Sequence, residues 1–177
     1  EQCLCSVQAA ISNINAEVLV IDNCSSDGSL EYLQPKFPWV IFLANNANTG
    51  FAKANNTALR QCRGAYVLYL NPDTIVGENC LDGALAFLAA NPNAGAVGVR
   101  MVDGSGHFLP ESKRAFPSPM VSFYKLSGLS SLFPESTIFN RYALGFLPEN
   151  GIHEVDVLCG AFLMAPRNVL DVVQGFD

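Results

Sequence analysis

The sequence is poor in charged residues and in histidine. Only 15% of its 177 residues are Asp, Glu, Lys or Arg, and it contains 2 histidines and 1 tryptophan. Globular proteins usually carry about 25% charged residues. With 10 basic and 16 acidic side chains, the net charge is −6. The chain therefore lacks the basic footprint of a nucleic-acid-binding protein, and we expect no DNA or RNA partner.

Long apolar runs and metal-ligand spacings are also missing. No stretch of about 18 apolar residues could span a bilayer, and residues 1–6 lack the basic start and apolar core of a signal peptide. The 6 cysteines form no C-x-x-C pair, so a zinc site is not expected. We expect free thiols in a reducing cytosol, with a disulfide framework as the alternative. The 50% hydrophobic content is enough to build a core.

Apolar runs that alternate with helical patterns predict the fold class. Runs typical of buried strands occur at 17–22, 40–44, 66–70, 96–100 and 155–158. Helical spacing occurs at 2–14, 29–33, 51–62, 80–90 and 166–173, with Gly64 expected to cap the third of these helices. This alternation predicts an α/β protein with a mostly parallel sheet and helices on both faces.

The segment 103–154 differs in character because it is rich in proline and aromatic residues. Residues 100–141 contain five basic and three acidic side chains, a net charge of +2, whereas residues 1–99 and 142–177 each carry −4. Such a basic, aromatic segment could contact an anionic or sugar-bearing substrate. The alternative is an ordinary connecting region with a helix near 118–131.

Three polar turns, 22–28, 45–50 and 71–74, follow three of the predicted strands. Ligands of parallel sheets bind at the carboxyl ends of the strands, where these turns should lie. Asp and Asn can bind a base or ribose, and Asp can hold a divalent cation that neutralises a diphosphate. The phosphate-binding patterns G-x-G-x-x-G and G-x-x-x-x-G-K-[ST] are absent, as is the nucleophile pattern G-x-S-x-G.

Four motifs stand in order along the chain: Val20–Ser29, Asn48–Asn56, Leu70–Thr74, and Leu158–Met164 followed by Arg167 and Gly175–Asp177. Together they resemble the signatures of family 2 glycosyltransferases, in particular the rhamnosyltransferase-like branch. The resemblance runs from Ala16 to Asp177. It implies a GT-A fold and a bacterial enzyme of cell-wall or polysaccharide synthesis. Such an enzyme moves a sugar, with inversion, from a nucleotide-diphosphate donor to a saccharide or lipid-linked acceptor.

The resemblance also implies a nucleotide-binding set. Asp22 and Asn23 stand where the family contacts the base and ribose, and Asn48 and Gly50 belong to the loop that approaches the nucleotide. Two positions of the next helix complete the set: Lys53, whose charge suits a diphosphate, and Asn55, where many members have Arg. Structural roles are the alternatives, with Asp22 and Asp27 as helix caps and Asn48 as a turn former.

A metal site and an acceptor side follow from the same resemblance. Asn71-Pro72-Asp73 replaces the D-x-D metal motif, so Asp73 would bind Mn or Mg and Asn71 would act through a metal-bound water. Asn71 as a turn former and Asp73 as an N-cap are the alternatives. Cys159 and Gly160 lie in the acceptor-side motif. There, Cys159 could instead be a small core residue.

Family members begin with an apolar strand before the first helix and continue past Gly-Phe-Asp to an acidic pair that supplies the general base. The resemblance thus implies a single incomplete GT-A domain lacking the first strand, with a donor half at 1–102 and an acceptor-side segment at 103–177. We expect the catalytic base beyond Asp177 and no sugar transfer by this chain alone. The enzyme is expected at the inner face of the cytoplasmic membrane, attached only through segments outside this chain.

Two other functions remain open. A nucleotidyltransferase binds nucleotides on a similar sheet, although its Gly-rich basic loop is not visible here. A non-catalytic nucleotide- or sugar-binding module would use the same loops without transferring a sugar.

Overall fold

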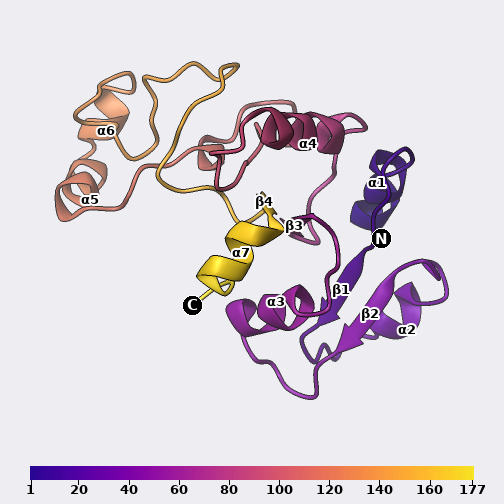
Figure 1. The fold of residues 1–177 in the computed structure, drawn as a ribbon. Coiled ribbons are helices and arrows are strands. Elements are labelled where there is room, and N and C mark those ends of the chain that lie inside the picture. The colour runs from indigo at the N-terminus through magenta and orange to yellow at the C-terminus, as the bar shows by residue number, and fades with distance from the viewer. The chain divides into compact units, whose positions relative to one another are not determined.

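The computed structural model describes all of residues 1–177, which form two compact units (Figure 1). The first unit comprises residues 1–97 and 164–177, and the second comprises residues 98–163. No helix is both long enough and apolar enough to cross a membrane. The functional division at residue 102 into a donor half and an acceptor-side segment stays a proposal.

Helices and strands alternate through the first unit. In chain order they are α1 (Gln2–Ala10), β1 (Leu19–Asp22), α2 (Ser29–Leu33), β2 (Ile41–Ala44), α3 (Phe51–Leu59), β3 (Tyr66–Leu70), α4 (Cys80–Ala90), β4 (Phe162–Pro166), whose first two residues belong to the second unit, and α7 (Arg167–Val173). Strands β1 and β2 are parallel, in a register that pairs Leu19 with Ile41 and Asp22 with Ala44. Their carboxyl ends therefore lie side by side, and this confirms the predicted α/β class with parallel strands.

The strands form two sheets of two strands each, β1–β2 and β3–β4. The prediction of strands at 96–100 and 155–158 was wrong. Val97 makes a single antiparallel bridge to Met164, and Val157 a single antiparallel bridge to Arg114. Gly98 interrupts the first of these segments, and an internal glycine weakens a strand. The family's additional first strand stays a prediction.

Two helices end earlier than their apolar patterns predict. Helix α1 ends at Ala10 instead of residue 14. Helix α3 ends at Leu59. The amide of Gln61 then donates to Ala58 O at 2.8 Å, a hydrogen bond of the 3₁₀ type between residues three apart, which often closes the last turn of a helix. Gly64 therefore does not cap α3. It allows a close approach instead, since a Cβ there would lie 3.0 Å from the Tyr66 carbonyl oxygen.

One apolar cluster holds α1 against the β1–β2 sheet. Leu4, Phe37 and Val40 are its buried members, and half-buried side chains packed around them include Val20 and Trp39. Burial of apolar side chains contributes roughly 1.5–3 kcal/mol each. The cluster therefore fixes β1 and β2, and with them the loops at their carboxyl ends.

The C-terminal residues return to α3 and β3. The amide of Asn56 forms two hydrogen bonds with the backbone of Phe176: Oδ1 accepts from N at 2.9 Å and Nδ2 donates to O at 2.7 Å. The Phe176 ring meets Tyr69 and Phe51 edge-on, at centroid distances of 4.7 and 5.5 Å. Burial raises the pKa of the Tyr69 hydroxyl, which has no hydrogen-bond partner. These hydrogen bonds link residues 120 positions apart and attach the C-terminal segment to α3.

The second unit is mostly irregular and contains a short 3₁₀ turn (Pro110–Ser112), α5 (Pro119–Leu126) and α6 (Leu129–Leu132). A single helix at 118–131 was the alternative expectation, but Gly128, at φ 78°, separates the two helices. Ser118 caps α5 by accepting a bond from Val121 N at 3.3 Å.

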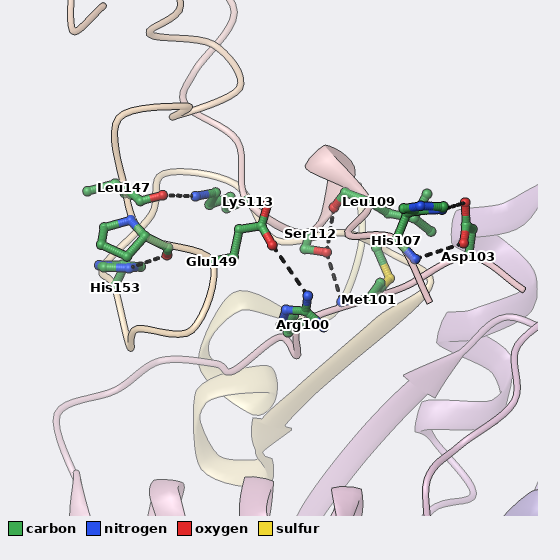
Figure 2. A network of polar contacts seen from close by, with 11 residues as sticks. Arg100, Met101, Asp103, His107, Leu109, Ser112, Lys113, Leu147, Glu149 and His153 are labelled. Carbon is green, nitrogen blue, oxygen red and sulfur yellow. Dashed lines mark hydrogen bonds and ion pairs between the residues drawn. The ribbon is translucent and has the colours of Figure 1, made fainter. Parts of the chain in front are cut away.

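Polar contacts tie the loops of the second unit together (Figure 2). Arg100 pairs with Glu149 at 3.3 Å, and the Asp103 carboxylate accepts the amide of His107 at 2.9 Å. The buried Lys113 ammonium donates to the Leu147 carbonyl. Burial also lowers the pKa of Lys113. Side chains, rather than a sheet, thus hold this segment in place.

Candidate nucleotide site

The first candidate residue, Asp22, is the last residue of β1, and its carboxylate is partly exposed. Both of its oxygens accept the amide of Ser25, at 3.2 and 3.3 Å, which folds the turn after the strand. Asp27, instead of Asp22, lies at the start of α2, where its Oδ1 accepts the amide of Ser29 at 3.0 Å. The side-chain and backbone hydrogen bonds from Ser29 lower the pKa of Asp27.

Asn23 joins the loop after β1 to the loop after β2. Its Nδ2 donates to Asn48 Oδ1 at 2.8 Å. Its Oδ1 accepts three bonds, from Asn45 Nδ2 at 3.1 Å, Thr49 N at 3.0 Å and Thr49 Oγ1 at 3.2 Å. The structure thus brings together two loops that the sequence placed at one edge. Asn45 and Thr49 were not among the predicted site residues, although the Asn-rich composition of their loop was the available signal.

The loop after β2 leads into α3, whose N-terminus has no side-chain cap. Asn48 Oδ1 accepts the amide of Gly50 at 3.0 Å, so Asn48 does shape the turn, as its alternative role predicted. Gly50 has φ 80° and ψ 169°, a conformation that L-residues rarely adopt. No side chain caps α3, so its first amides are available to bind an anion.

Lys53 and Asn55 lie on the first turns of α3. Lys53 is exposed, and its ammonium group makes no hydrogen bond or ion pair. Asn55 Nδ2 donates to Phe51 O at 2.9 Å within the helix. The Lys53 ammonium is therefore free to bind an anion, whereas the Asn55 amide group already donates a hydrogen bond within the helix.

The turn after β3 contains the expected metal-binding pair. The backbone carbonyl of Asn71 accepts Thr74 Oγ1 at 2.8 Å, and Cys3 Sγ lies 3.7 Å from the same oxygen. Asp73 is exposed and makes no hydrogen bond. The predicted alternative, Asp73 as the N-cap of the next turn, was wrong, because the Asp73 carboxylate accepts no backbone amide, and α4 begins only at Cys80.

The metal-ligating side chains of this turn are few. No group of three His, Cys, Asp or Glu side chains anywhere in the chain is placed to hold a metal ion. Magnesium is often bound by one or two carboxylates together with substrate phosphates and waters. One free carboxylate, Asp73, therefore fits a cation that binds jointly with a diphosphate.

The acceptor-side residues lie in the second unit. Cys159 is half-buried, and its carbonyl accepts Phe162 N at 3.3 Å just where β4 begins. Gly160 is exposed, and a Cβ at that position would meet no atom within 4 Å. Neither crowding nor a left-handed backbone requires glycine there.

Comparison with known proteins decides the family. The family model described as glycosyl transferase family 2 matches residues 1–148. The chain belongs to glycosyltransferase family 2. This membership agrees with the three motifs that lie within the matched residues and with the Asp- and Asn-rich strand ends.

Two curated relatives of this family 2 chain are, by their names, a rhamnosyltransferase and an N-acetylglucosaminyltransferase. An N-acetylglucosaminyl-diphospho-decaprenol L-rhamnosyltransferase of Mycobacterium tuberculosis is 29% identical over 90% of this chain. A poly(ribitol-phosphate) beta-N-acetylglucosaminyltransferase, TarS, of Staphylococcus aureus is 25% identical over 77% of it. The chain spans 55% of the first relative and 24% of the second.

Solved structures of similar fold are GT-A glycosyltransferases. The mannosyltransferase PcManGT from Pyrobaculum calidifontis, in complex with GDP-Man and Mn2+, matches with a TM-score of 0.57 and 21% identity, over 91% of this chain and 38% of that one. S. aureus TarS 1–349 matches with a TM-score of 0.52 and 21% identity, over 84% of this chain and 46% of that one. These matches confirm the predicted GT-A fold.

Proposed function

We propose that this chain binds the donor of a glycosyltransferase that moves a sugar from a nucleotide diphosphate to a saccharide or lipid-linked acceptor, with inversion. The observation that carries the proposal is the Asn23 network, which fixes two strand-end loops beside the uncapped start of α3. The mannosyltransferase relative of similar fold binds GDP-Man, and this supports a nucleotide-sugar donor.

The proposed roles follow from position and charge. Asp22 accepts hydrogen bonds from the base or ribose, because its carboxylate is partly exposed at the end of β1. The α3 amides and the Lys53 ammonium face the negative charge of the diphosphate. Asn48 and Gly50 shape the loop between them.

A divalent cation, Mn or Mg, would neutralise the diphosphate as the nucleotide leaves. Asp73 is the residue proposed to hold it, with Asn71 acting through a metal-bound water. The Mn2+ bound by the PcManGT relative supports this role.

The general base of the inverting reaction is not assigned. Asp156, a carboxylate just before the acceptor-side motif, already accepts Phe116 N at 3.1 Å. We propose that the base belongs to the full-length enzyme, acting in cell-wall or polysaccharide synthesis at the inner face of the cytoplasmic membrane. Sugar transfer by the purified 177-residue chain would contradict that proposal.

A calorimetric titration with UDP, dTDP and GDP tests donor binding. We expect at least one of them to bind, and manganese to tighten the binding. Asp73→Ala should abolish most of the manganese effect, since the site would lose its free carboxylate. The Kd of the nucleotide in the presence of manganese should rise about tenfold or more.

Glu78→Ala is the matched control, because Glu78 is another exposed carboxylate without a hydrogen bond in the same connection between β3 and α4. It should leave the manganese effect unchanged. An equal manganese effect in Asp73→Ala and the original chain would remove the metal role from Asp73.

A further inference from the structure

Two side chains of α1 hold the segment 71–76, which follows β3. Cys3 and Ser6 are three residues apart, so they lie on the same side of the helix. The Ser6 hydroxyl accepts the amide of Val76 at 3.0 Å. Cys3 Sγ lies 3.7 Å from the carbonyl oxygen of Asn71. Both ends of the segment are thus attached to α1.

No regular element fixes the Asp73 backbone. The segment 71–76 belongs to neither a helix nor a strand. Its first four residues form a tight turn, in which the Asn71 carbonyl accepts the amide of Thr74 at 3.3 Å and its hydroxyl at 2.8 Å. Asp73 lies inside this turn, so the place of its carboxylate depends on what holds the two ends of the segment.

Ser6 makes the firmer of the two attachments. Val76 is buried, and its amide donates to the Ser6 hydroxyl and to no backbone carbonyl. A buried amide without a partner is costly, so this bond determines where the segment ends. The Ser6 hydroxyl also donates to the Cys3 carbonyl at 2.7 Å, which fixes its orientation. The Cys3 thiol, which is buried, lies 3.8 Å from Thr74 Oγ1 as well.

Helix α1 also connects the segment 71–76 to the sheet that bears the nucleotide loops. No strand pairing joins the β1–β2 sheet to the β3–β4 sheet. Leu4, which is next to Cys3, belongs to the buried cluster that packs α1 against β1 and β2. Through these contacts, α1 holds the turn that contains Asp73 at a set place relative to the loops after β1 and β2.

We propose that Ser6, supported by Cys3, is a positioning residue of the metal site. It holds Asp73 where its carboxylate can bind a cation together with the diphosphate of the nucleotide. Ser6 acts through the backbone of the segment 71–76 and is not a ligand of the cation. This inference rests on the proposed function, because it requires that Asp73 binds the cation.

Calorimetric titration tests the proposal with whichever of UDP, dTDP and GDP binds the original chain. The quantity compared is the manganese effect, defined as the ratio of the Kd without manganese to the Kd with it. Ser6→Ala should reduce this ratio about fivefold, because the Val76 amide loses its partner and the turn is held less firmly. The Kd without manganese should change by less than about twofold, because the nucleotide loops make no hydrogen bond to Ser6.

Two further serine variants separate positioning from a general loss of stability. Ser6→Thr should keep the manganese effect within about twofold of that of the original chain, since a helical threonine hydroxyl can bond the carbonyl one turn earlier, as Ser6 does. Ser12→Ala carries the same change as Ser6→Ala at an exposed serine whose hydroxyl makes no hydrogen bond. It should bind like the original chain with and without manganese.

Cys3→Ala gives a second test that does not depend on the folding of Ser6→Ala. It removes the thiol contact with Asn71 and leaves Ser6 in place. We expect it to reduce the manganese effect about threefold.

The outcomes distinguish this proposal from the proposed function. An undiminished manganese effect in Ser6→Ala, or in Cys3→Ala if Ser6→Ala does not fold, would overturn the positioning role alone. Equal losses in Ser6→Ala and Ser6→Thr would also overturn it, because the hydroxyl would not be the cause. No manganese effect in the original chain would instead refute the metal role of Asp73, and the positioning role with it.

Discussion

Asn23→Ala should weaken nucleotide binding by about tenfold or more. The four hydrogen bonds of this side chain hold the loop of Asn45–Gly50 against the end of β1. Each such bond contributes about 0.5–1.5 kcal/mol, so their loss makes the ordered loop a minor state. The apparent Kd rises in proportion as that state is depleted. Calorimetric titration with the nucleotide that binds the original chain measures the effect.

Asn46→Ala is the control for this variant. Asn46 lies in the same loop, is exposed and makes no hydrogen bond. Its replacement should change the Kd by less than about twofold, as for most exposed positions. If Asn23→Ala binds as tightly as Asn46→Ala, the loop does not depend on Asn23 and the proposed site is wrong.

Phe176→Ala should lower the free energy of unfolding by about 2 kcal/mol. A buried phenylalanine costs about 3–5 kcal/mol when truncated, and Phe176 is only half-buried. The variant removes the ring contacts with Tyr69 and Phe51. Urea unfolding followed by Trp39 fluorescence measures the loss, because Trp39 is the only tryptophan and belongs to the same unit.

Phe116→Ala provides the comparison, since Phe116 is 70% exposed. It should cost less than about 0.5 kcal/mol. Asn56→Leu should cost about 1–3 kcal/mol, because it leaves the Phe176 amide and carbonyl without their partner. A loss for Phe176→Ala no larger than that for Phe116→Ala would mean that the C-terminal residues do not hold α3.

The sequence predicted the fold class and the meeting of the polar loops after β1 and β2, because both depend on local patterns. Parallel strands read as continuous apolar runs, as in the β1 strand Leu19–Asp22, and short polar turns mark their ends. The ends of α1 and α3 were harder to predict, since tertiary packing and the closing turn decide where an apolar pattern stops being helical. The strand at Phe162–Pro166 was missed, because its first residues belong to Leu158–Met164, which was interpreted only as an acceptor-side motif.

The sequence predicted which residues belong to the candidate site but not which of them contact one another. Asp22, Asn23 and Asn48 were named from the motifs, yet only the structure shows that Asn23 bridges the two loops. The bond between Asn56 and Phe176 could not be predicted, because its partners are 120 residues apart and neither forms a local pattern.

The most direct test of the donor site measures how fast the Cys24 thiol is modified. Cys24 is exposed, has φ 68° and lies two residues after Asp22, whereas Cys5 on α1, which is also exposed, serves as an internal control. Peptide mapping after brief treatment with iodoacetamide gives both rates. We predict that UDP, dTDP or GDP, with manganese, slows modification of Cys24 and leaves Cys5 unchanged. If none of the three changes the rate at Cys24 while the chain remains folded, the nucleotide does not bind at these loops.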